Sequence, residues 1–325
     1  MNRELAMQIA DAVLYEGYML YPYRRSALKN RQRWTFGILY PPDYEEVLVG
    51  TERSSMHSEC LLKIKGACCL SMKLRFLHSF TKTVVNSSSD NSDEVTDRWD
   101  EALPRSIEFE PDLDIFHPQQ FAFSFPGGTS VSECPTRRKI IETQQQIQGL
   151  LTFRTETIEH NLLKITIHVG NQTQASSIER DRNCALSRAL MSAHMILNTN
   201  NGEFVSLLDP PEEFRAHIPA CKNIGTFPVL LGNSGEHDMM LCSPIILYDY
   251  PQIAPESAGD FYDATEMDEM LTLRVMTLSE EEKKQMRSAD DHARTLLERT
   301  EQSAREQLIK THGVIRNLRH LTQPE

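Results

Sequence analysis

Five acidic residues late in the chain have side chains of the kind that a hard cation requires. They are Asp260, Asp263, Glu266, Asp268 and Glu269. A cation such as Ca²⁺ needs several carboxylate oxygens that converge on one point. Helical spacing would instead place these carboxylates on different faces, and Asp263 with Glu266 fits a capping box at a helix N-terminus. Helix capping is the preferred interpretation, and Asp260, Asp263 and Asp268 remain the candidate metal ligands.

The seven cysteines are a second group with chemical potential. Their number is odd, and no two of them form the C-x-x-C spacing of zinc sites and redox motifs. Cys68 and Cys69 lie in an apolar run, which favours small buried hydrophobes, with a redox or metal role as the alternative. The motifs of serine hydrolases, zinc proteases, P-loop proteins and dinucleotide-binding proteins are missing from the sequence. We therefore expect no cofactor.

Residues 14–34, LYEGYMLYPYRRSALKNRQRW, combine tyrosines with a group of cations. Tyr, Trp and Arg are enriched at binding surfaces, because they give a large contact area at a small entropic cost. A solvated polar segment is the alternative. Pairing with the acidic excess of residues 256–282, within the chain or between subunits, is a further option. We expect a partner-binding surface made of Tyr21, Tyr23, Arg24, Arg25, Lys29, Arg31, Arg33 and Trp34.

Charge and hydropathy restrict the classes of partner. The chain has 325 residues and a formal net charge of −12. This acidic balance argues against a nucleic-acid-binding protein and against adsorption to anionic lipid. No apolar run approaches the ~20 residues that span a bilayer, and acidic residues interrupt any signal-peptide-like segment at the N-terminus. We expect a cytoplasmic protein, which could form a homo-oligomer.

Period-two alternation in the first half of the chain is typical of antiparallel strands. It predicts a pair of strands at residues 62–65 and 73–76. A further strand is predicted at residues 163–169, with residues 150–158 as its hairpin partner. The Pro-Gly-Gly sequence at residues 126–128 predicts a turn rather than a phosphate-binding loop.

Helical spacing of apolar residues dominates the remaining pattern. It predicts a short amphipathic helix near the N-terminus, within residues 2–20, and a second helix from residue 179 to residues 198–202. Capping boxes at Asp263 and Ser279 predict two C-terminal helices, the second of which is long and polar.

These patterns together predict an α+β fold. The first half would be mostly antiparallel sheet, and the second half would be mixed α/β and end in helices. We expect a sheet-rich domain at residues 1–180, with a flexible loop near residues 86–94. Residues 181–325 would form an α+β part with a long C-terminal helical segment.

Four segments are distinctive enough to be compared with known families. They are residues 14–41, FVSLLDPPEEF at 204–214, NIGTFPVLLG at 223–232, and SPIILYDYPQIAPESAGDFYDATEMDEMLTLRV at 243–275. Together they resemble an uncharacterised bacterial protein family that is associated with gene clusters of nickel-iron hydrogenases. The resemblance implies an accessory role and supplies no reaction and no catalytic residues.

The sequence therefore supports two hypotheses of different classes. The preferred one is a non-enzymatic accessory or assembly protein that binds a protein partner, such as a hydrogenase subunit or maturation factor. The alternative is an enzyme or metal-handling protein that uses the acidic segment 260–269 or buried cysteines.

Overall fold

The computed structural model describes most of the chain up to residue 252. The described residues are 2–16, 36–87, 93–113, 117–134, 138–174 and 177–252, together with Glu280, Lys283 and Leu297. The chain divides into two units, and residues 1–18 and 34–252 form the first of them. This first unit contains every strand described below.

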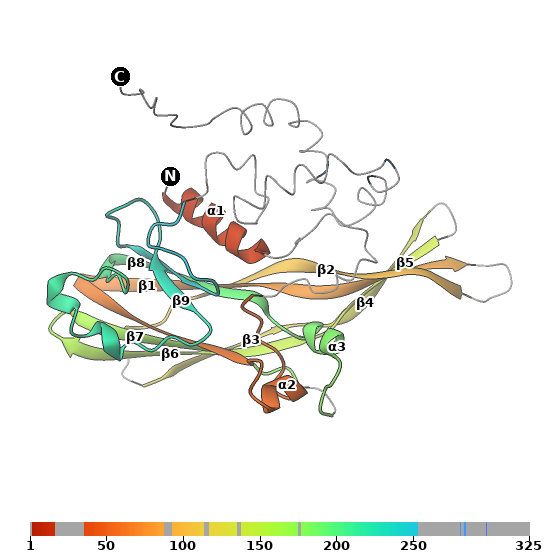
Figure 1. Ribbon diagram of the computed structural model, residues 1–325, viewed down its shortest axis with the longest axis horizontal. Helices are drawn as coiled ribbons and strands as arrows, with labels where there is room; N and C mark the ends of the chain where they lie inside the picture. The colour runs from red at the N-terminus through yellow and green to blue at the C-terminus, as the bar shows by residue number, and fades with distance from the viewer. Residues whose placement is uncertain are drawn as a thin grey trace, which may run out of the picture. The chain divides into compact units, whose positions relative to one another are not determined.

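The first unit is built on one ten-stranded sheet, in which every pair of neighbouring strands is antiparallel (Figure 1). The main path through the sheet runs β3-β6-β7-β1-β8-β10-β9, while β2 and β5 also pair with β1 and β4 pairs with β5. The strands are β1 Ser55–Ser87, β2 Asp93–Phe109, β3 Gln119–Phe125, β4 Gly128–Cys134, β5 Arg138–Gln144, β6 Ile147–Glu159, β7 Leu162–Asn171, β8 Met191–Phe204, β9 Phe227–Leu230 and β10 Met239–Ser243.

Strand β1 runs for 33 residues and organises the whole sheet. On one edge its residues 55–63 pair with β7, and its residues 72–87 pair with β2. On the other edge residues 62–77 pair with β8, and residues 80–86 pair with β5. The strand therefore leaves a core region and continues into a four-stranded arm with the order β4-β5-β1-β2.

The arm and the core also share a long hairpin, in which β3 is followed by β4 along one side and β5 by β6 along the other. Its pairing register is the same in β3–β6 as in β4–β5, so the chain does not reverse at residues 126–127. The predicted turn at this position is therefore wrong, because the segment is a break inside a strand that keeps its direction. Gly127 fits here because a Cβ atom would approach the backbone nitrogen of Gln146 to 2.7 Å.

His78 of β1 lies at the same break, and its side chain is fully buried. Its Nε2 donates a hydrogen bond to the carbonyl oxygen of Gln145, at 2.9 Å, where neither β5 nor β6 continues the ladder. Burial, with a smaller contribution from the nearby Arg105 guanidinium, lowers the pKa of His78 to about 4. A neutral imidazole therefore satisfies a backbone acceptor that the ladder leaves open.

The main core lies between two parts of the bent sheet, here called limbs, one of which contains β1 and the other β3. The Phe76 ring of β1 contacts the rings of Phe123 and Phe125 in β3, at centroid distances of 6.3 and 5.5 Å. Strands β6 and β7 separate β3 from β1 in the sheet order, so these contacts require the limbs to pack face to face. Aromatic pairs at such distances stabilise a core beyond the burial of their area.

Helices cover little of the first unit. They are α1 Asn2–Tyr15, α2 Glu45–Leu48 and α3 Arg182–Leu186, with single 3₁₀ turns at Glu212–Phe214 and Ile218–Ala220. The apolar face of α1, which includes Ile9 and Val13, is buried, and the helix contacts β8 and β1. This helix confirms the predicted N-terminal amphipathic helix.

The predicted α+β class is wrong. Of the residues that the structure describes, 54% lie in strands and 14% in helices, and the sheet is antiparallel throughout. The error arises mainly from the helix predicted from residue 179 to residues 198–202, because its second half forms most of β8. Seven successive residues of β8, from Met191 to Leu197, are buried, so the strand lacks the alternation that identifies a half-exposed strand. The predicted C-terminal helical segment lies outside the described residues, apart from Glu280, Lys283 and Leu297.

Candidate functional site

The loop that follows β10 is held at its first residues by close backbone packing. Pro244 lies against Gly37, where any Cβ atom would overlap the proline ring, and the positive φ of Gly37 (+53°) also favours glycine. The carbonyl oxygen of Gly37 accepts a hydrogen bond from the backbone N–H of Ala193 in β8, at 2.9 Å. The start of the loop is therefore fixed to the sheet.

Asp249 holds the other end of the same loop. One oxygen of its carboxylate accepts from the backbone N–H of Leu230 at the end of β9, at 2.7 Å. The other accepts from the hydroxyl of Ser206, at 2.5 Å. The Ser206 oxygen in turn accepts from the backbone N–H groups of Leu208 and Asp209. A single carboxylate therefore joins the 244–250 loop, the edge strand β9 and the turn after β8.

Tyr250 completes this attachment with its backbone in the left-handed region, at φ +55°. Its N–H donates to the carbonyl oxygen of Leu230, at 2.8 Å, and its ring packs edge-to-face on His237. Burial raises the pKa of the Tyr250 phenol, and the Gly235 backbone hydrogen bond opposes the shift. A non-glycine residue adopts this conformation only where surrounding contacts impose it.

Between these two fixed ends the loop exposes two large apolar side chains. Ile246 is 78% exposed and Tyr248 is 86% exposed, the two highest values among the exposed large hydrophobic residues of the described chain. Phe227, which begins β9, is also exposed, and it pairs with Ser243 just before the loop. Large apolar side chains held in the solvent by a fixed backbone are typical of a contact surface. We call residues 244–250 the contact loop.

A buried polar cluster lies beneath α1, on the paired strands β1 and β8. Arg75 and His194 are cross-strand neighbours, both buried, and Arg75 forms an ion pair with Asp11 of α1. The Nδ1 atom of His194 donates to the carbonyl oxygen of Ser192, at 2.7 Å. Burial, with the adjacent Arg75 guanidinium, lowers the pKa of His194 to about 3. The ion pair connects α1 to the sheet, and a neutral imidazole lies beside it on β8.

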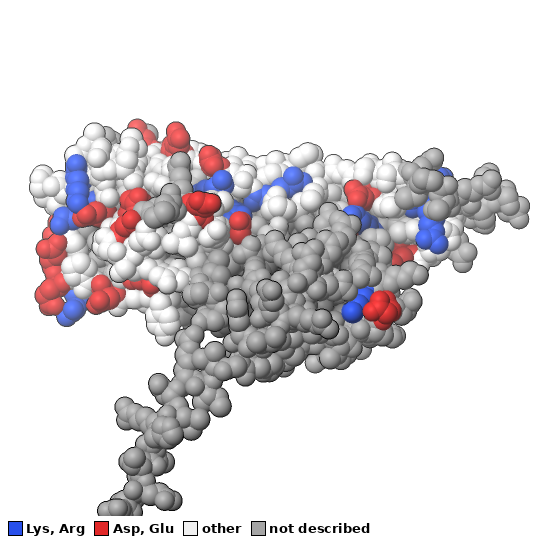
Figure 2. Space-filling view, turned by 90° about the horizontal axis from the view of Figure 1, so that it is seen from above, with Lys and Arg blue, Asp and Glu red and all other residues white. Residues whose placement is uncertain are grey.

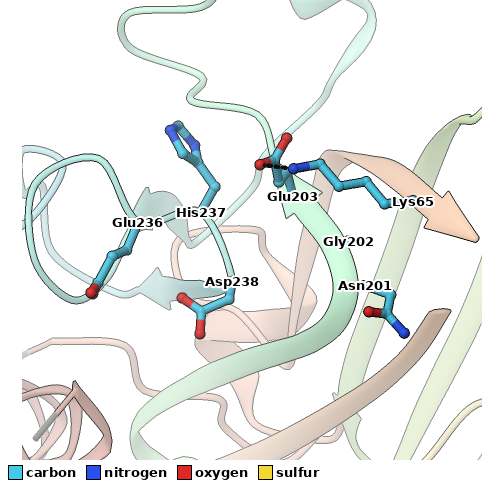
Figure 3. Close-up of a pocket in the computed structure, with 7 residues that line it drawn as sticks. All are labelled: Lys65, Asn201, Gly202, Glu203, Glu236, His237 and Asp238. Carbon is cyan, nitrogen blue, oxygen red and sulfur yellow. Dashed lines mark hydrogen bonds and ion pairs between the residues drawn. The ribbon is translucent and has the colours of Figure 1, made fainter.

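A shallow hollow of about 370 Å³ lies between β8 and the segment before β10 (Figure 3). Glu203 forms an ion pair with Lys65 at one side of it. Glu236 caps the turn at Asn233, where it accepts from the backbone N–H at 2.9 Å. Backbone hydrogen bonds from the N–H groups of Thr199 and Phe204 hold this segment on β8. The carboxylates of Glu203 and Glu236 thus already bind other groups of the protein.

The buried thiols are poorly suited to the chemistry of the alternative hypothesis. Cys60 and Cys242 lie in the main core, and all the cysteines for which the structure describes a side chain are free. Burial raises the pKa of Cys242 to about 11, burial with the nearby Glu59 raises that of Cys221 to about 11, and burial raises that of Cys60 well above its ordinary value. A thiol that stays protonated is a weak nucleophile and a weak metal ligand. Within the described residues, no three His, Cys, Asp or Glu side chains are grouped to hold a metal ion.

Neither set of site residues predicted from the sequence can be placed in the structure. The partner-binding candidates Tyr21, Tyr23, Arg24, Arg25, Lys29, Arg31, Arg33 and Trp34 lie outside the described residues. The metal candidates Asp260, Asp263 and Asp268 also lie outside them. The sequence patterns did not predict the contact loop, whose residues enter only through the segment 243–275 of the family resemblance. Pro244 and Pro251, at the two ends of this stretch, are the signal that could have identified a loop.

Charged side chains are unevenly spread over the face shown in Figure 2. Acidic side chains gather toward the end drawn at the left, with a few Lys and Arg among them. In the described part of the chain, no helix has the length and apolar character that crossing a membrane requires.

No family model matches the chain, and no curated protein is significantly similar to it.

Proposed function

We propose that this protein binds another protein and performs no reaction of its own, as an accessory or assembly factor in the cytoplasm. The observation that carries the proposal is the exposure of Ile246 and Tyr248 on a loop fixed at both ends. The low thiolate character of the buried cysteines further favours a binding role over cysteine chemistry.

Rigid presentation makes this loop suitable for binding. Exposed apolar side chains on a floppy loop would lose conformational entropy when they are buried against a partner. Here Asp249 and Tyr250 have already fixed the backbone, so that cost is reduced before binding. Tyrosine is among the residues that contribute most at protein interfaces. Tyr248 is therefore the expected anchor, and Ile246 the adjoining apolar contact.

The partner is proposed by resemblance to be a nickel-iron hydrogenase subunit or maturation factor. In this proposal the segment from Tyr21 to Trp34 supplies a second contact surface. Its arginines would favour a partner with an acidic patch, and attraction between such surfaces weakens as salt rises.

The test is a pull-down with the full chain from its native host, followed by affinity measurements with the partner it captures. We expect the double variant Ile246→Ser/Tyr248→Ser to bind that partner at least about tenfold more weakly, which corresponds to ~1.4 kcal/mol. The matched control is Leu48→Ser/Val49→Ser. Leu48 ends α2 and Val49 follows it, and their side chains are also exposed, at 57% and 66%. Unchanged binding by the loop variant, with the control also unchanged, would exclude the contact loop as the interface.

Two further measurements separate the proposal from its alternative. Replacing Arg24, Arg25 and Arg31 together by Ser should weaken binding most at low salt, where charges are least screened. Protein purified without added metal should contain no stoichiometric nickel, iron or zinc. Stoichiometric metal would instead favour the enzyme or metal-handling hypothesis.

A further inference from the structure

Strand β4 is one of the two outer strands of the arm, and within the described residues its outer edge is open to another strand. β4 forms ladder hydrogen bonds with β5 alone in the part of the chain that the structure describes. Its residues 128–132 are exposed. The arm strands β1, β2 and β5 extend together at the right of Figure 1, at the end opposite β9. An unpaired strand edge presents free N–H and C=O groups that can pair with a further strand.

Of the other outer strands, β2 and β9 carry features that hinder such pairing, and residues 128–132 of β4 do not. The outer strand β2 has exposed charges at Asp97, Arg98 and Asp100 and contains Pro104. The outer strand β9 is only four residues long and contains Pro228. In contrast, residues 128–132 (GTSVS) contain neither a charge nor a proline. Charges and prolines are the usual means by which proteins protect a sheet edge.

β4 is also held ready for pairing by its contacts with β5. The hydroxyl of Thr129 lies 3.4 Å from that of Thr143, and the hydroxyl of Ser130 donates to Glu142, also at 3.4 Å. Val131 stands opposite Ile141 in the ladder and is 59% exposed. The strand is therefore fixed in an extended conformation, while its outer edge pairs with no strand among the residues that the structure describes.

We propose that β4 is a homodimer interface, in which the β4 strands of two copies pair in antiparallel orientation around a two-fold axis at Val131. A two-fold interface must be self-complementary. With the axis at Val131, the two Val131 side chains face each other, and Ser130 faces Ser132 of the second copy. No charged pair arises at these three positions, and the exposed apolar side chain of β4 gains an apolar neighbour. The two four-stranded arms would then join into one continuous sheet of eight strands.

The sequence of β4 favours a second copy over an unrelated peptide as the occupant. An edge that selects a foreign peptide usually adds pockets for its alternate side chains. The short side chains of β4 offer little for such selection, whereas the same Ser-Val-Ser sequence pairs well with itself. The short contact predicts a weak dimer that is populated only at high protein concentration.

The test is sedimentation of the full chain over a series of concentrations. We expect wild type to show a monomer–dimer equilibrium and Val131→Lys to weaken it by about tenfold, because two like charges would face each other at the axis. The matched control is Val95→Lys on β2, since Val95 is also 59% exposed in the same arm. Mixing Val131→Lys with Val131→Glu should restore the dimer, because the opposite charges would then face each other.

A cross-linking experiment keeps the proposal testable if the charged variants fold poorly. Directly opposed residues of an antiparallel pair have Cα atoms ~4.5–5.5 Å apart, within the range that a disulfide bridges. Oxidised Val131→Cys should therefore form a covalent dimer, and Val95→Cys should not. Wild type that stays monomeric at every concentration would overturn the proposal. So would Val131→Lys and Val95→Lys variants that both dimerise as strongly as wild type.

Discussion

Acidification should destabilise the protein through His194, and the size of the effect follows from its surroundings. The imidazole is fully buried, donates to the Ser192 carbonyl, and lies beside the Arg75 guanidinium. Its pKa is about 3 in the folded protein, against an ordinary value of about 6.5. Protonation would place a second buried cation beside Arg75, and Asp11 already pairs with that guanidinium.

The sign of the pH effect follows from proton binding. Since the folded pKa is lower than the unfolded one, the unfolded state takes up the proton first as the pH falls. The stabilisation is thus complete above pH ~6.5, and it is lost progressively between pH ~6.5 and pH ~3. The slope is about 1.4 kcal/mol per pH unit for one histidine, so from pH 7 to pH 5 the loss from His194 is about 2 kcal/mol. His78, with a pKa of about 4, acts in the same direction.

The measurement is urea unfolding of wild type and His194→Asn at pH 7 and at pH 5. Asparagine keeps an N–H donor near the position of Nδ1 and does not titrate in this range. The variant should be less stable than wild type at pH 7, but its loss of stability between the two pH values should be about 2 kcal/mol smaller. His160→Asn, at an exposed position between β6 and β7, is the control and should keep the wild-type pH dependence. An equal loss in wild type and His194→Asn would refute the conclusion that a neutral His194 is required beneath α1.

Three further changes test the local structure and the contact loop. Asp181→Ala should cost about 1 kcal/mol in urea unfolding, because Asp181 accepts hydrogen bonds from two backbone N–H groups in the first turn of α3; Asp181→Ser should retain most of that stability. Gly149→Ala should cost about 1–3 kcal/mol, because the new methyl group would overlap the Phe123 ring, whereas Gly128→Ala meets no atom within 4 Å and should be nearly neutral. Asp249→Ala should weaken partner binding although it leaves both exposed side chains in place, and unchanged affinity would show that binding does not require a fixed loop.

Local alternation was sufficient to predict the elements that are exposed on one face. In β7, Leu163, Ile165 and Ile167 are buried, while His168 points to solvent, and the pairing of β7 with β6 was predicted correctly. The sequence of such a strand alternates between apolar and polar residues, because one face contacts the core and the other contacts water.

The elements that were mispredicted depend on residues far away in the chain. Residues 62–65 and 73–76 were expected to be two paired strands, and both belong to β1. The Gly66 backbone, with φ +102°, belongs to an irregularity in the pairing of β1 with β8 and does not reverse the chain. Whether a glycine marks a bulge or a turn is decided by the partner strand, and here that partner lies more than 130 residues further along the chain.

The break at residues 126–127 also depends on residues elsewhere in the chain, and it decides that β4 lies at the edge of the arm. A reversal of the chain there would have ended the hairpin at β3, and the arm would lack β4. Instead Gly127 admits the close approach of Gln146, and the buried His78 binds the Gln145 carbonyl, so the register continues from β6 into β5. On one side of the break β6 pairs with β7, and on the other side β5 pairs with β1 and leaves β4 as an outer strand of the arm. The open edge proposed as a dimer interface therefore depends on an interior histidine and one glycine, so variants at these two positions should disturb dimerisation together with the stability of the arm.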